Sequence, residues 1–75
     1  MKEYKVLHVT STRYCGDDRT EWRVYDYRQK NFPVADERND PNGCALIEYV
    51  LNFYGKQGWR LVSTNGQYLY LERDI

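Results

Sequence analysis

The sequence has no excess of either charge, no long apolar run and very few cysteines or histidines. Eleven Lys plus Arg balance eleven Asp plus Glu, so the formal net charge is zero. A duplex-binding domain is normally basic, and we therefore do not expect duplex nucleic acid as a partner. No apolar run approaches the roughly 18 residues that a spanning helix needs, and no cationic segment followed by an apolar stretch opens the chain. These absences predict a cytoplasmic protein without a membrane partner.

The chain also has few residues of the kinds that build metal sites and catalytic centres. Cys15, Cys44 and the single histidine, His8, provide at most three soft ligands, too few for a zinc quartet or a disulfide framework. A Cys/His catalytic pair requires His8 to meet one of the two cysteines in the fold. A domain this small also leaves little room for a closed pocket. We expect no enzyme, no catalytic residues, no metal and no cofactor.

What is present suits one small folded domain over residues 1–75. Hydrophobic residues make up 41% of the chain and charged residues 29%, which is typical of a globular domain. A chain of this length buries only about 60% of the surface that its unfolded form exposes. Its stability is marginal unless partners share their surfaces, so we expect a homo-oligomer.

Two segments in the first half of the sequence alternate between residues of two faces. Residues 3–10 (EYKVLHVT) and 22–28 (WRVYDYR) are rich in β-formers, which predicts two strands. Residues 11–20 contain Gly and Asp turn signals and connect these strands as a first hairpin. Residues 30–39 carry charges of both signs without periodicity and are expected to form a surface connection.

A helix start is predicted at Asp40-Pro41. The carboxylate accepts backbone donors, and proline at the first helical position loses no hydrogen bond. The helix is predicted over residues 41–56. Cys44 falls in its first turn, where we expect a small buried residue, with a reactive thiol as the alternative.

The apolar residues of this helix form two adjacent stripes. One has helical i, i+3, i+4, i+7 spacing, and a second lies beside it. A single small sheet needs about one stripe, so the surplus either meets the loop before the helix or faces another subunit. The first stripe is Leu46, Tyr49, Val50 and Phe53, and the second, a candidate subunit contact, is Ile47, Leu51 and Tyr54.

A second hairpin follows the helix. Gly55 and Gly58 are candidate C-caps, after which residues 59–64 (WRLVST) predict a strand. Asn65-Gly66 is a strong two-residue hairpin signal, and residues 67–73 (QYLYLER) predict the return strand. The order β-β-α-β-β predicts an α+β fold, a single small antiparallel sheet with one helix packed on one face.

The two faces of this sheet differ in composition. The aliphatic set Leu7, Val9, Val62, Leu69 and Leu71 is the candidate for the helix-covered face. The other face is aromatic and open to three interpretations: cross-strand pairs that only stiffen the sheet, a self-association surface, or a ligand or nucleic-acid platform. It is expected to carry Tyr4, His8, Tyr68 and Tyr70, together with Trp22 or the Tyr25/Tyr27 pair.

The first hairpin interleaves cations with aromatic residues. Arginine donates two hydrogen bonds to a phosphate while an aromatic ring stacks on a base, which is the chemistry of a nucleotide or single-strand site. Asp17, Asp18 and Glu21 lie among these cations, so a solvated hairpin and a polynucleotide groove stay as alternatives. The candidate ligand-binding residues are Arg23, Arg28, Tyr25, Tyr27 and Trp22.

Three segments resemble a family of very small bacterial and phage domains, the domain of unknown function 4177 family. They are EYKVLHV at 3–9, ALIEYVLNFYGKQGWRLVS at 45–63 and YLYLER at 68–73. The shared pattern is a Tyr-Lys-Val strand, a helix ending in Leu-Asn, and Gly-x-x-Gly-Trp-x-Leu-Val before a closing strand. The resemblance implies a small sheet with one helix and no assigned activity. This sequence departs from the pattern at Arg60, where an acid is usual, and in its long Arg/Tyr hairpin.

These observations support three hypotheses. The first is a non-catalytic binding domain that acts as a homo-oligomer and sequesters a nucleotide-like signal molecule, as a phage anti-defence protein does. The second is an inhibitor or adaptor that docks on a host protein by the same surface. The third is a single-stranded nucleic-acid binder, whose affinity must fall steeply with salt.

Overall fold

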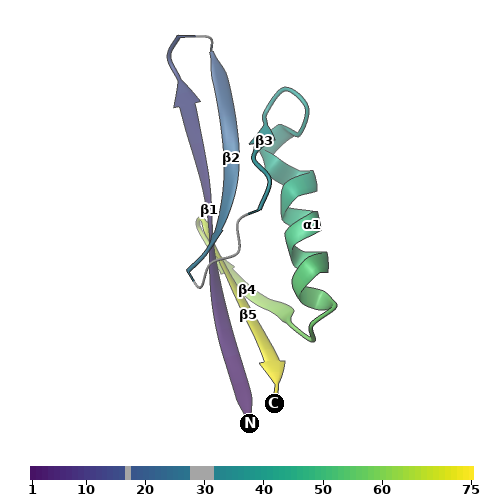
Figure 1. Ribbon diagram of the computed structural model, residues 1–75. Coiled ribbons are helices and arrows are strands. Elements are labelled where there is room, and N and C mark those ends of the chain that lie inside the picture. The colour runs from purple at the N-terminus through teal and green to yellow at the C-terminus, as the bar shows by residue number, and fades with distance from the viewer. Residues whose placement is uncertain (17, 28–31) are drawn as a thin grey trace.

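The computed structural model describes residues 1–16, 18–27 and 32–75. One antiparallel sheet has the strand order β3-β2-β1-β5-β4, and the helix lies against one of its faces (Figure 1). The predicted α+β class is therefore confirmed. The predicted element order was incomplete, because a two-residue strand precedes the helix in a segment without periodicity. The elements are β1 (Lys2–Tyr14), β2 (Arg19–Asp26), β3 (Ala35–Asp36), a 3-10 turn (Pro41–Gly43), α1 (Cys44–Gly55), β4 (Arg60–Asn65) and β5 (Tyr68–Asp74).

The first hairpin is longer than predicted. β1 and β2 keep their antiparallel register as far as Tyr14 opposite Arg19, so most of the predicted loop over residues 11–20 is strand. The Arg19 guanidinium lies 4.9 Å from the centre of the Tyr14 ring, and Arg13 pairs with Asp18 at 2.5 Å across the turn. These contacts stabilise the end of the β1–β2 hairpin, which extends beyond the rest of the sheet (Figure 1). The alternation of apolar residues does not reveal them.

Asp40 caps the helix as predicted, although residues 41–43 lie between it and the start of α1. Its carboxylate accepts the backbone N–H groups of Ala45 at 2.7 Å and Leu46 at 2.9 Å. Asn42 and Gly43 both have positive φ, so α1 begins only after them, three residues later than predicted. Cys44 is exposed at this start, which corrects the expectation of a buried residue.

The core lies between α1 and one face of the sheet. Of the aliphatic set predicted for the covered face, only Val62 is misplaced: it is exposed at a bulge in β4, between Leu61 and Ser63. The bulge adds a residue to the strand and breaks the two-residue alternation on which the prediction rested. The buried residues are Leu7, Val9, Val24, Leu46, Val50, Tyr54, Trp59, Leu69 and Leu71.

Tyr54 of the second helix stripe is buried in the molecule's own interior, which corrects its prediction as a subunit contact, whereas Ile47 and Leu51 are only partly buried and stay predicted contacts. Tyr54 is 3% exposed, and Ile47 and Leu51 pack against the core. Part of the surplus apolar surface of the helix meets the preceding loop. Phe32 packs edge-on against the rings of Tyr54 at 5.8 Å and of Phe53 and Tyr49.

The second hairpin turns one residue later than predicted. Asn65 still pairs with Tyr68, so the loop residues are Gly66 and Gln67. Gly66 has φ +61°, as the first loop position of a type II′ turn requires. This register sets which side chains of β5 face the helix and which face away from it.

Candidate functional site

The side chains on the sheet face away from the helix form the candidate binding surface, here called the open face. Cross-strand neighbours share a face, and His8 of β1 lies opposite Tyr25 of β2 and Tyr68 of β5. Val6 lies opposite Tyr70 in the next row. The open face comprises Tyr4, Val6, His8, Thr10, Arg23, Tyr25, Tyr68, Tyr70 and Glu72. The four predicted interface residues of β1 and β5, Tyr4, His8, Tyr68 and Tyr70, are therefore brought together.

A hollow of about 400 Å³ in this face is lined by one aliphatic and four aromatic residues, here called the aromatic groove. His8 and Tyr68 stack with ring centres 4.5 Å apart and planes inclined by 10°, which makes one wall flat. Tyr25 is half exposed and Tyr27 is 96% exposed. Such a lining suits a flat apolar or aromatic group, because offset and edge-on ring contacts favour it. The lining residues are Val6, His8, Tyr25, Tyr27 and Tyr68.

The predicted ligand-binding residues are divided by the structure. Arg23 and Tyr25 lie on the open face, and Tyr27 lines the groove. Trp22 belongs to the opposite face, where its indole N–H donates to Glu37 at 2.7 Å, so it does not join the others. Arg28 lies outside the described residues.

Arg23 is the cation that the structure places on the open face beside Tyr25. Its guanidinium pairs with Glu21 at 3.3 Å. A hydrogen bond with Tyr14 raises the pKa of Arg23, which keeps the side chain cationic at any cellular pH. A strand rises about 3.4 Å per residue, so Arg23 lies roughly 7 Å along β2 from Tyr25.

A polar cluster that sequence reasoning missed lies on the helix side of the sheet. Lys5 pairs with Asp26 at 3.0 Å, and the Tyr54 hydroxyl donates to the same carboxylate. The Lys5 ammonium also lies 5.2 Å from the Trp59 ring centre. The available signal was the alternation itself, which puts Lys5 in line with Leu7 and Asp26 in line with Val24.

The chemistry of this cluster is structural. Burial, followed by the hydrogen bond to Asp26, raises the pKa of Tyr54 well above its usual value. A tyrosine held protonated in this way is a hydrogen-bond donor and not a base. Lys5 has its charge balanced by Asp26, so the two side chains and Tyr54 tie the sheet to α1.

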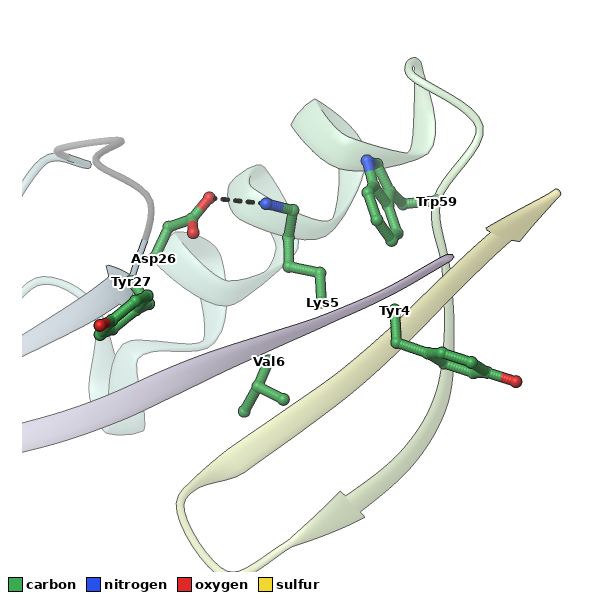
Figure 2. Close-up of a pocket in the computed structure, with 6 residues that line it drawn as sticks. All are labelled: Tyr4, Lys5, Val6, Asp26, Tyr27 and Trp59. Atoms are coloured by element: carbon green, nitrogen blue, oxygen red, sulfur yellow. Dashed lines mark hydrogen bonds and ion pairs between the residues drawn. The ribbon is translucent and has the colours of Figure 1, made fainter. Parts of the chain in front are cut away.

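A second hollow, of about 330 Å³, follows the edge of β1 beside this cluster. Figure 2 shows Lys5 reaching Asp26 on the helix side, near Trp59, while Val6 and Tyr4 leave β1 on the other side. The hollow therefore wraps around the edge of the strand and touches both faces. Its lining residues are Tyr4, Lys5, Val6, Asp26, Tyr27 and Trp59.

The residues that the structure describes contain no group of three or more His, Cys, Asp or Glu side chains arranged to hold a metal ion. No helix among them has the length and apolar character needed to cross a membrane.

Comparisons with protein-family models, with curated proteins and with solved structures find no match to this chain. The resemblance to the domain of unknown function 4177 family stays a prediction from the sequence.

Proposed function

We propose that this chain is a non-catalytic binding domain, acting as a homo-oligomer, whose aromatic groove takes the flat ring of a nucleotide-like ligand. The observation that carries the proposal is the lining of the groove, in which the His8/Tyr68 stack and the ring of Tyr25 surround a hollow large enough for one ring system. Stacking on such rings is a general way to hold a base.

Arg23 supplies the contact for the anionic end of such a ligand. It lies on the same face as Tyr25 and about 7 Å along β2, a spacing comparable to that between the base and the phosphate of a nucleotide. A planar guanidinium binds phosphate through paired hydrogen bonds. The ion pair between Arg23 and Glu21 is partly buried and has a long contact of 3.3 Å, and an incoming phosphate would replace Glu21 as the partner of the guanidinium.

Native mass spectrometry tests the proposal. The protein is measured directly from cells and again after incubation with a nucleotide panel, because one spectrum reports both subunit number and retained mass. We expect a nucleotide-sized adduct. Loss of one stacking ring in Tyr25→Ala should weaken binding by about tenfold or more. Arg23→Ala should weaken the binding of phosphorylated ligands more than the binding of their nucleosides.

Two variants serve as matched controls. Tyr49→Ala removes an equally exposed tyrosine from the helix, and Arg13→Ala removes an arginine from the other face of the first hairpin. Both should bind as the wild type does. Equal losses in test and control variants, or no adduct with any member of the panel, overturn the proposal and favour a protein partner.

A further inference from the structure

Among the residues that the structure describes, no strand pairs with residues 2–6 of β1 on the side away from β5. In the described residues, pairing with β2 ends where Leu7 lies opposite Asp26. The N–H of Val9 donates to Gln67 at 2.7 Å, and the carbonyl of Met1 accepts from Ile75, so the odd-numbered backbone groups of β1 point toward β5. Backbone groups alternate along a strand, and those of Lys2, Tyr4 and Val6 therefore point out of the edge.

Sheet edges are normally protected by proline, by bulges or by charges turned inward. Residues 2–6 contain neither a proline nor a bulge. Glu3 and Lys5 are inward charges, and each is already balanced within the chain, Glu3 by Arg73 and Lys5 by Asp26. They discourage an apolar strand, and a strand that carries the opposite charges in register adds a second opposite charge beside each of them.

We propose that two copies of this chain pair their β1 edges antiparallel about a two-fold axis at Tyr4. This register puts Glu3 of each copy opposite Lys5 of the other, Lys2 opposite Val6, and Tyr4 opposite Tyr4. Oppositely charged cross-strand pairs stabilise a sheet. The pairing uses residues 2–6, and only Met1 of the second copy reaches the position opposite Leu7, where Asp26 of β2 already pairs.

The charges select this register over its neighbours. An axis at residue 3 puts Glu3 against Glu3, and an axis at residue 5 puts Lys5 against Lys5; like charges directly opposite each other are destabilising. An axis at residue 5 also sets three residues of the second copy, from Met1 to Glu3, against positions of β1 that β2 already pairs with, whereas the axis at Tyr4 sets only Met1 there. Of the three, only the axis at Tyr4 pairs opposite charges.

This pairing gives the homo-oligomer of the proposed function a contact, and to that extent it rests on that proposal. It joins the two five-stranded sheets into one, with both helices on the same side. It also brings Lys2 of the second copy opposite Val6, at the rim of the aromatic groove. Each groove then has close to it an ammonium group of the other copy, which pairs with Asp74 and Glu72 of its own chain.

Site-directed disulfide crosslinking tests both the contact and its register. The background is Cys15→Ser with Cys44→Ser, because both native cysteines are exposed. Directly opposed, hydrogen-bonded residues have Cα atoms about 5.5 Å apart, within the range of a disulfide. With diamide as oxidant, most of the Tyr4→Cys chains should become covalent dimers.

Val6→Cys is the matched control. In the proposed register the two Val6 positions lie about 14 Å apart along the strands, beyond the reach of a disulfide. Val6→Cys alone and Lys2→Cys alone should stay uncrosslinked, whereas a mixture of the two should form the mixed disulfide. Circular dichroism of each variant confirms that it folds, and light scattering gives the subunit number of the wild type.

The outcomes separate this inference from the proposed function. A wild-type dimer in which Tyr4→Cys does not crosslink, or in which Val6→Cys crosslinks equally well, overturns the β1 contact and leaves the homo-oligomer in place. A wild-type monomer that retains a nucleotide overturns the β1 contact and the oligomer but leaves ligand binding in place. Crosslinking without any retained ligand supports the contact and counts against the ligand.

Discussion

At the scale of single residues, the Tyr54 hydroxyl is the polar link between α1 and the sheet. It donates to the Asp26 carboxylate, which Lys5 also contacts. Tyr54→Phe keeps the ring and removes this donor, so the free energy of unfolding should fall by about 1.5–3 kcal/mol, as for other hydrogen bonds to charged groups. Urea denaturation measures the change. Tyr49→Phe, which alters a half-exposed tyrosine of the same helix, should have almost no effect, and equal losses in both variants contradict the role given to Tyr54.

Asp36 gives the protein a specific sensitivity to acid. The side-chain and backbone hydrogen bonds from Arg38 lower the pKa of Asp36 from 3.8 to about 2. The unfolded chain therefore takes up a proton before the folded one does, and this contribution to stability is lost as the pH falls from about 4 to about 2. In Arg38→Ala the pKa of Asp36 should rise toward 3.8, as measured by carbon NMR titration of the carboxyl group. Arg13→Ala, in which a distant arginine is removed, should leave that pKa where it is.

At the scale of elements, the start of α1 depends on Gly43. Its φ of +67° favours glycine, and a Cβ atom there would lie 3.0 Å from Cβ of Trp22. Gly43→Ala combines left-handed strain with a clash against β2, so it should lower the free energy of unfolding by about 2–4 kcal/mol. Gly16→Ala is the matched control, because Gly16 has no positive φ and no neighbour within 4 Å of the added atom. Urea denaturation of both variants decides whether the glycine at the helix start is required.

Some elements of the fold can be predicted from the sequence and others cannot. Strong local signals worked: Asp40 does cap the helix, and the turn at Gly66 does join two strands. The failures occurred where partners distant in sequence decide the structure. The bulge at Val62 depends on pairing with β5, and the burial of Tyr54 depends on Asp26, which lies in the first hairpin. The candidate ligand-binding set was divided for a similar reason, because Trp22 packs against Gly43.

At the scale of the whole molecule, the chain is more extended than its length requires. The radius of gyration is 13.3 Å, whereas about 11 Å is usual for a compact domain of this length. The principal extents of 49 × 20 × 19 Å reflect the long β1, which extends past β5 at one end and past β2 at the other. Sequence composition predicted that a partner has to share the surface of so small a domain. The structure adds that, within the described part of the chain, no strand pairs with one side of β1 over residues 2–6.

A dimer formed through β1 makes thermal stability depend on protein concentration. Association stabilises the folded state by mass action, so the unfolding temperature of the wild type should rise as the protein is concentrated. Tyr4→Pro removes an N–H that points out of the edge and none that β1 donates to β5, so the variant should fold and lose this concentration dependence. Tyr4→Ala keeps the N–H, so its unfolding temperature should still depend on protein concentration. Calorimetry over a wide concentration range compares the three proteins, and a wild-type unfolding temperature that does not change with concentration contradicts pairing at β1.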